Sequence, residues 1–209
     1  MKEKITSIFD YLIERYPALA GCRGDIEKAT EIMAESFRAG GRLLACGNGG
    51  SASDAQHIVG ELMKSFVLPR KLPDAMREKL GDDYLSDNLQ GALPAVSLIG
   101  EAALSTAYAN DCAPDLAFAQ QVLGLGRKGD VLLGISTSGN SKNVVYAAKV
   151  ARAQGMQVIM LTGEGGGKCA ALADAAVCVP EKETYKVQEY HLPVYHAMCL
   201  ALEEEFFGE

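Results

Sequence analysis

Short apolar segments that alternate with helical patterns constrain this fold more than any other feature of the sequence. The segments begin near Arg42, Leu93, Asp130, Gln157 and Ala175, and Gly- or Ser-rich loops follow several of them. Strands that are apolar throughout are typical of a parallel sheet covered on both faces, because neither face meets water. The sequence therefore predicts an α/β protein whose ligands bind beyond the carboxyl ends of the strands.

Amphipathic helices are predicted around these segments. Apolar residues recur every three or four positions over residues 5–13, which indicates one apolar helix face. A second helix is expected over residues 25–39, ended by Gly40 and Gly41. Both helices precede the first strand, so their apolar faces are candidates for an oligomer interface. Further helices are predicted over residues 53–66, 142–154, 169–173 and 187–206.

One segment, residues 67–92, interrupts this alternation. It carries many charges, two prolines and little periodicity. Two interpretations are open: a surface excursion that contains a short helix, or a lid or interface flap.

Composition excludes several functional classes. The formal net charge of −7 and the pI near 5.1 argue against a nucleic-acid binder, which needs a basic face. The six cysteines form no CxxC pair, which indicates reduced thiols in the cytoplasm. No segment approaches the ~20 apolar residues of a membrane span. The opening residues, MKEKITSIFDYLIERYP, carry charges among their apolar positions, unlike a secretory signal.

The loop after the third apolar segment, GISTSGNS, has the character of a phosphate site. It offers several small hydroxyl donors and joins a strand to a helix, whose first N–H groups favour an anion. No lysine follows at the spacing of a nucleotide-binding P-loop, so the pattern predicts a single phosphate monoester. The alternative is a capped helix with polar loop residues. A second Gly-rich loop, Gly47–Ser51, follows the first strand in the same way.

Histidines and carboxylates suggest a second cluster. His57 and Glu61 are four residues apart on one predicted helix, so they share a face. Gln188 and His196 lie about two turns apart on the C-terminal helix, with His191 between them. Two imidazoles, a carboxylate and an amide suit a divalent metal such as zinc. The same groups could perform acid–base work without a metal, or the histidines could be structural.

With these residues in view, the chain resembles the sugar isomerase (SIS) family and, within it, the phosphoheptose isomerases. The stretches that carry the resemblance are LLACGNGGSASDAQHIVGEL, YAND, GDVLLGISTSGNSKNVVYAA, VIMLTGEGGGK and VQEYHLPVYH. The resemblance implies a single SIS domain over residues 1–209, with N-terminal helices over residues 1–40 and an insertion or lid at 67–92. It also implies a three-layer αβα sandwich with a five-stranded parallel sheet, a long C-terminal helix and a homotetramer.

The resemblance also implies an aldose–ketose isomerase of a sugar phosphate, with sedoheptulose 7-phosphate as the leading substrate. Glu61 would be the catalytic base and His196 the acid. One Zn²⁺ per subunit would be held by His57, Glu61, Gln188 and His196. The substrate would contact Asn48, Gly49, Gly50, Ser51, Asn110, Asp111, Ser136, Thr137, Ser138, Ser141 and Gln188.

Two alternatives accompany this expectation. Residues 67–92 make a longer connection than the resemblance leads us to expect, and they directly follow the helix of His57 and Glu61, so the enzyme could act on a different sugar phosphate. A third hypothesis comes from another class, since some relatives with the same fold bind the DnaA replication initiator without catalysis. Those relatives lack the carboxylate and second imidazole found here as Glu61 and His196, which favours an enzyme.

Overall fold

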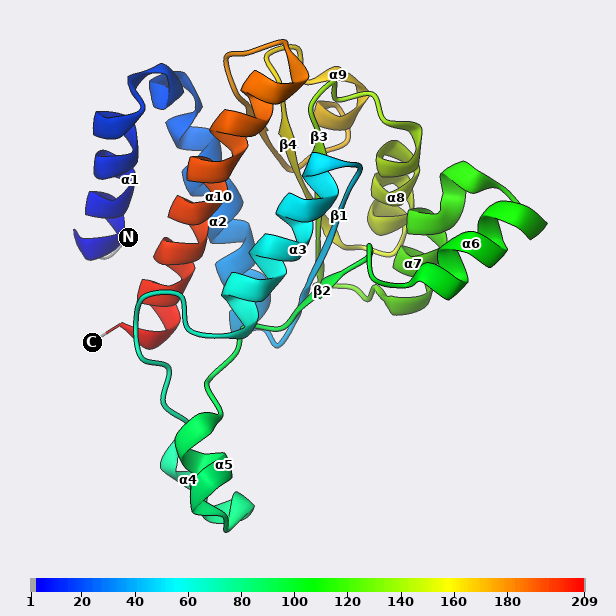
Figure 1. The fold of residues 1–209 in the computed structure, drawn as a ribbon. Helices are drawn as coiled ribbons and strands as arrows, with labels where there is room; N and C mark the ends of the chain where they lie inside the picture. Colours follow the sequence, from blue (N-terminus) through cyan, green and yellow to red (C-terminus); the bar gives the residue numbers. More distant parts are fainter. Residues whose placement is uncertain (1–2, 209) are drawn as a thin grey trace.

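Five parallel strands form the centre of the computed structural model, which describes residues 3–208 (Figure 1). Their order across the sheet is β2-β1-β3-β4-β5. The chain leaves β1 to form β2 on one side of it, and then returns to form β3 on the other side. The strands are β1 (Leu43–Gly47), β2 (Ala95–Ser97), β3 (Val131–Ser136), β4 (Gln157–Thr162) and β5 (Ala175–Cys178).

Both faces of the sheet are covered, which explains why its strands are apolar throughout. On β1, Leu43 and Ala45 enter one core while Leu44 and Cys46 enter the other, because side chains alternate along a strand. The first core lies under α2 (Arg23–Arg38) and α3 (Gly50–Met63). The second lies under α7 (Ala117–Leu125), α8 (Lys142–Ala153) and α9 (Gly167–Ala170). The predicted three-layer αβα sandwich is confirmed.

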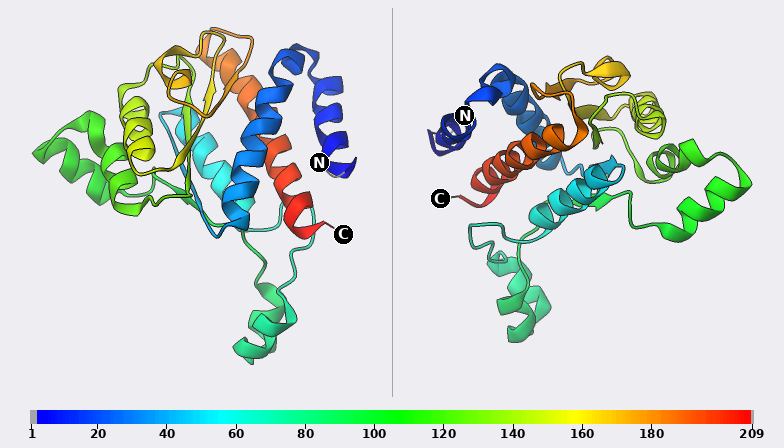
Figure 2. Two further views of the ribbon diagram at one scale, coloured as in Figure 1. Left: turned by 180° about the vertical axis from the view of Figure 1, so that it is seen from behind. Right: turned by 45° about the horizontal axis from the view of Figure 1, so that its top comes forward.

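The first and last helices of the chain pack together on the α2–α3 side of the sheet. Helix α1 (Glu3–Arg15) contacts α10 (Thr184–Phe207), which also contacts α2 and α3. A 3₁₀ helix, η1 (Pro17–Cys22), joins α1 to α2. Figure 2 shows the two ends of the chain on the same side of the molecule. No helix among residues 3–208 has both the length and the apolar character needed to cross a membrane.

Some helices differ from the sequence expectation. The segment after β2 forms α6 (Ala102–Asp111), a 3₁₀ turn η2 (Pro114–Leu116) and α7, none of which the periodicity predicted. Helix α6 buries no residue, so no apolar stripe marks it in the sequence. Helix α3 begins at Gly50 rather than Ser53, because the Gly-rich loop itself supplies the first turn.

Residues 67–92 form an arm that projects from the body (Figure 1). It contains α4 (Asp74–Leu80) and α5 (Asp83–Asn88), in which Ser86 alone is buried. Its base is firmly held, because the Gly91 N–H donates to the Arg70 carbonyl at 2.7 Å. The structure shows an excursion with two short helices, and its role as a lid stays a prediction.

Candidate active site

The two Gly- and Ser-rich loops lie side by side where the strand order reverses. Gly47 pairs with Ile135 at the ends of β1 and β3, so the segments that follow both strands leave the same edge of the sheet. Such a reversal point is where open α/β sheets bind ligands. Asn48 and Asn143 join the loops by two amide hydrogen bonds of 3.0 and 2.8 Å.

The predicted phosphate loop is built around a buried serine. Ser136, 2% exposed, lies at the end of β3 with its Oγ 2.9 Å from the Ser141 Oγ. Ser138 Oγ accepts a hydrogen bond from the Asn140 N–H at 3.2 Å. Gly139 has a positive φ of 64°, and a Cβ there would collide with the Gly166 carbonyl. Only glycine therefore fits this turn, which packs against the backbone of Gly166 and Gly167.

Three helices begin around this loop. Helices α3 and α8 start directly after the two loops, and each points its first N–H groups toward the reversal point. The start of α10 completes the group, since Thr137 Oγ1 lies 3.5 Å from Thr184 Oγ1. A Cβ on Gly50 would lie 2.5 Å from the amide nitrogen of Gln188, so α3 and α10 touch here. Converging helix starts favour a bound anion.

The predicted histidine–carboxylate cluster lies further along α3 and α10. His57 Nε2 is 3.2 Å from Glu61 Oε1, and the His57 and His196 rings are 5.1 Å apart between centroids. Lys64 Nζ lies 3.0 Å from the other Glu61 oxygen, Oε2. His57, Glu61 and His196 therefore come together as the sequence predicted.

Burial shapes the electrostatics of this cluster. Desolvation lowers the pKa of His196, the nearby His57 ring lowers it further, and Glu61 opposes both. The Nε2 atom of His196 is buried without a hydrogen-bond partner. The Glu61 side chain is only 12% exposed. Burial and the His57 ring therefore favour the neutral form of the His196 imidazole.

The predicted metal ligands fit a divalent ion by chemistry but are not gathered around one point. The donors would be two imidazoles, one carboxylate and one amide, and the buried His196 Nε2 has no hydrogen-bond partner within the protein. Gln188 lies near the start of α10, against Gly50, about two turns from His196. Within residues 3–208, no three His, Cys, Asp or Glu side chains form a ready cation cage.

Asn110 and Asp111 do not join the other predicted residues. They are exposed at the end of α6, where Asn110 Nδ2 donates to Asp111 Oδ1 at 2.8 Å. Helix α6 packs on η2 and α7, and Figure 1 shows it beyond α7. A contact of these two residues with substrate stays a prediction.

Sequence reasoning missed two polar residues behind His57. The Tyr195 hydroxyl is 3.1 Å from His57 Nδ1 and 3.2 Å from Asp54 Oδ1. Asp54 could have been predicted from the sequence, because it precedes His57 by three residues and so shares its helix face. Tyr195 could not, since only packing of α10 on α3 brings it there.

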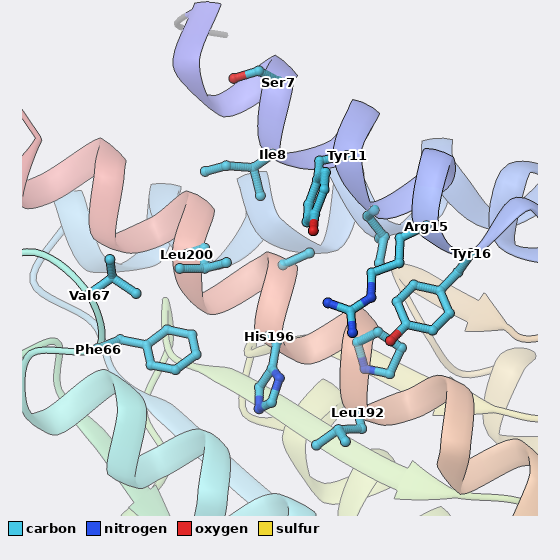
Figure 3. A pocket seen from close by; sticks show the side chains of 13 residues that line it. Ser7, Ile8, Tyr11, Arg15, Tyr16, Phe66, Val67, Leu192, His196 and Leu200 are labelled. Atoms are coloured by element: carbon cyan, nitrogen blue, oxygen red, sulfur yellow. The ribbon is translucent and has the colours of Figure 1, made fainter.

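A cavity of about 510 Å³ opens on the other flank of His196, between α1 and α10. Figure 3 shows His196 below a mostly apolar wall that includes Ile8, Phe66 and Leu200, with the Arg15 guanidinium nearby. This hollow is separate from the phosphate loop. The pocket instead lies along the apolar surface between α1 and α10 and reaches His196 of the histidine cluster.

Comparison with known proteins gives consistent matches. The model of the SIS domain family matches residues 16–77 and 90–163, together more than half of the chain. A curated protein named phosphoheptose isomerase from Akkermansia muciniphila is 36% identical over 208 residues, which is 100% of both chains. One of the same name from Thiobacillus denitrificans is 41% identical over 186 residues, covering 88% of this chain and 84% of that protein.

Solved structures agree with these relatives. A phosphoheptose isomerase from Neisseria gonorrhoeae superposes with a TM-score of 0.76 at 37% identity, over 97% of this chain and 98% of the other. One from Francisella tularensis has a TM-score of 0.77 at 31% identity, over 97% of both chains.

Proposed function

Because this chain belongs to the SIS family and, within it, to the phosphoheptose isomerases, we propose that it interconverts sedoheptulose 7-phosphate and D-glycero-D-manno-heptose 7-phosphate. The observation that carries the proposal is that α3 starts at the phosphate loops and bears His57 and Glu61. At 1.5 Å per residue, Gly50 and His57 are about 10 Å apart along this helix. That separation matches an extended sugar phosphate with its phosphate at one end and its carbonyl at the other.

The isomerisation moves a proton between adjacent carbons through an enediol. Glu61 takes the proton beside the carbonyl, since its carboxylate is largely shielded from water and faces the cluster. His196 exchanges protons with the substrate oxygens, and burial favours the neutral form of its imidazole. The phosphate loop binds the far end of the sugar and so holds its reacting carbons against Glu61.

The same proposal includes one zinc ion per subunit. His57, Glu61, Gln188 and His196 would hold it, and their donor chemistry supports this assignment. A bound zinc ion would stabilise negative charge on the substrate oxygens. In that arrangement His57 would only hold the ion, while Glu61 and His196 would also act beside the reacting carbons.

We further propose a cytoplasmic homotetramer. The six unpaired cysteines support a reducing compartment. The apolar α1–α10 face, with Tyr11 60% and Leu192 41% exposed, supports burial against another subunit.

A different sugar phosphate is the second candidate. The match to the SIS family is interrupted over residues 78–89, within the arm that follows the helix of His57 and Glu61. An arm that closed over the site could change the sugar that is accepted.

Proton exchange with solvent tests the proposal. The protein is incubated with sedoheptulose 7-phosphate in D₂O, with and without zinc, and NMR follows deuterium at the carbons beside the carbonyl together with the aldose product. Incorporation together with product supports the enediol reaction on this heptose. No incorporation, even with zinc, refutes the substrate and directs the same assay to other sugar phosphates.

A further inference from the structure

A part-buried chain of two hydrogen bonds lies behind His57. Tyr195, on α10, is 1% exposed, and its hydroxyl lies between Asp54 and His57, both on α3. The distances are 3.2 Å to Asp54 Oδ1 and 3.1 Å to His57 Nδ1. Both helices therefore contribute to the position of one imidazole.

With Asp54 ionised and the His57 imidazole neutral, the donors and acceptors in this chain admit one arrangement. An ionised carboxylate only accepts hydrogen bonds, so the single Tyr195 proton goes to Asp54. The phenolic oxygen then accepts from His57, which requires the proton of the neutral imidazole to be on Nδ1. The phenol keeps its proton near neutral pH, since the ordinary pKa of tyrosine is about 10.

This arrangement leaves Nε2 of His57 as a lone pair on the side of the catalytic cluster. Nε2 is 3.2 Å from Glu61 Oε1, and both atoms then offer electron pairs. Two facing acceptors repel unless a cation or a proton lies between them. The Nε2 atom of His196, which is buried without a hydrogen-bond partner, belongs to the same cluster.

We propose that Tyr195 is a positioning residue that fixes His57 as the Nδ1–H tautomer and thereby prepares Nε2 to bind a divalent cation. The cation-binding half of this proposal rests on the proposed function, whereas the tautomer half does not. Without the hydroxyl, His57 would gain more by moving its proton to Nε2 and donating it to Glu61. Loss of a hydrogen-bond partner behind a ligand histidine typically lowers metal affinity 10–100-fold.

Nitrogen-15 NMR of the histidine side chains tests the tautomer directly. The chain has three histidines, so His191→Gln and His196→Gln variants assign the His57 signals. Spectra are taken on chelator-treated full-length protein at about pH 8, above the ordinary pKa of histidine. We expect Nδ1–H in the native protein and Nε2–H in Tyr195→Phe. An Nε2–H signal in the native protein, or an unchanged tautomer in Tyr195→Phe, overturns the proposal.

Zinc affinity, measured by competition with a chromophoric chelator, tests the consequence. The zinc Kd should rise about 10–100-fold in Tyr195→Phe. Tyr190→Phe is the matched control, because it removes the same atom from a half-buried tyrosine of the same helix. An unchanged zinc Kd in Tyr195→Phe refutes the role in cation binding. If neither protein binds zinc while the tautomers are as expected, the proposed metal fails and the tautomer assignment stands.

Discussion

Glu61 is the residue on which the proposed chemistry depends most directly. Its Oε1 lies 3.2 Å from His57 Nε2 and its side chain is 12% exposed, so it acts in a protected setting. In Glu61→Gln, we expect kcat to fall about 10²- to 10⁴-fold, the usual contribution of a general base. Binding of the sugar phosphate should persist, because the phosphate loop is untouched.

An activity assay beside isothermal titration calorimetry measures both quantities. The exposed Glu14 on α1 supplies a matched control, and Glu14→Gln should leave both unchanged. Turnover in Glu61→Gln at the native rate would remove Glu61 as the base.

At the residue scale, the sequence predicted what local spacing determines. His57 and Glu61 fall on one helix face because of their separation alone, and the structure places them in contact. Tyr195 could not be predicted, since its partners His57 and Asp54 are about 140 positions away in the chain. The position of Gln188, against Gly50 rather than beside His57, likewise follows from how α3 and α10 pack.

Among the structural elements, the turn after α3 depends on one buried carboxylate. Glu203, 1% exposed, accepts hydrogen bonds from the backbone N–H groups of residues 66–68 and from Arg70 Nε. Burial opposes ionisation, but these donors together lower the pKa of Glu203. Arg70 in turn donates to the carbonyls of Glu61 and Leu62, which fixes the end of α3.

Replacing this carboxylate should weaken the fold strongly. We expect Glu203→Gln to lower the free energy of unfolding by about 3–5 kcal/mol, because Arg70 keeps a buried charge without its partner. Urea unfolding measures the change. Glu205→Gln, two positions along α10 at a surface ion pair with Arg38, should cost less than about 1 kcal/mol. Equal losses in the two variants would contradict the special role of Glu203.

The arm should contribute little to the stability of the body. Neither α4 nor α5 buries an apolar side chain, and the bonded Arg70 and Gly91 bring the two ends of the arm together. Replacing residues 73–89 with a short Gly-Ser linker should therefore change the free energy of unfolding by less than about 1 kcal/mol. Thermal unfolding measures this, and a protein that no longer folds would show that the arm supports the core.

The turnover of the same deletion variant separates the two interpretations of the arm. A surface excursion predicts native turnover, whereas a lid predicts a loss of turnover with the fold intact.

Helices α6 and α7 could not be predicted from the sequence as reliably as α8. Helix α6 has no buried face, whereas α8 buries Val144, Ala147, Ala148 and Ala151 at helical spacing.

For the whole molecule, acid stability should depend on one buried histidine. His191 is fully buried, its Nε2 is 3.2 Å from the Thr162 carbonyl, and burial lowers its pKa to about 4. The unfolded chain protonates this group near the ordinary value of about 6.5, so it binds more protons between these pH values. Its contribution is fully present above about pH 6.5 and is lost as the pH falls toward 4, about 3 kcal/mol in all.

His191→Gln should remove that part of the pH dependence, because glutamine can still donate to Thr162 but does not titrate. Urea unfolding at several values between about pH 7 and about pH 4.5 compares the two slopes. The native protein should lose stability more steeply on acidification. Parallel slopes would assign the pH dependence to other groups.

The order of the strands in the sheet could not be predicted from the sequence. Apolar runs predicted all five strands and their parallel direction, because burial on both faces leaves that pattern. The order β2-β1-β3-β4-β5 was not available from the runs, since each of them is apolar on both faces and fits any neighbour. Only the packed structure shows which loops meet at the reversal point.

The packing of α10 on α1 and α2 has a consequence for how the protein is made. A ribosome releases α1 and α2 at the start of synthesis, yet α10, which packs on both, comes from residues 184–207. At 5–20 residues per second, roughly 10–30 s pass between the synthesis of α1 and α2 and the synthesis of α10. The nascent chain therefore exposes apolar helix surface during most of its synthesis. We expect chaperones that bind nascent polypeptides to contact α1 and α2.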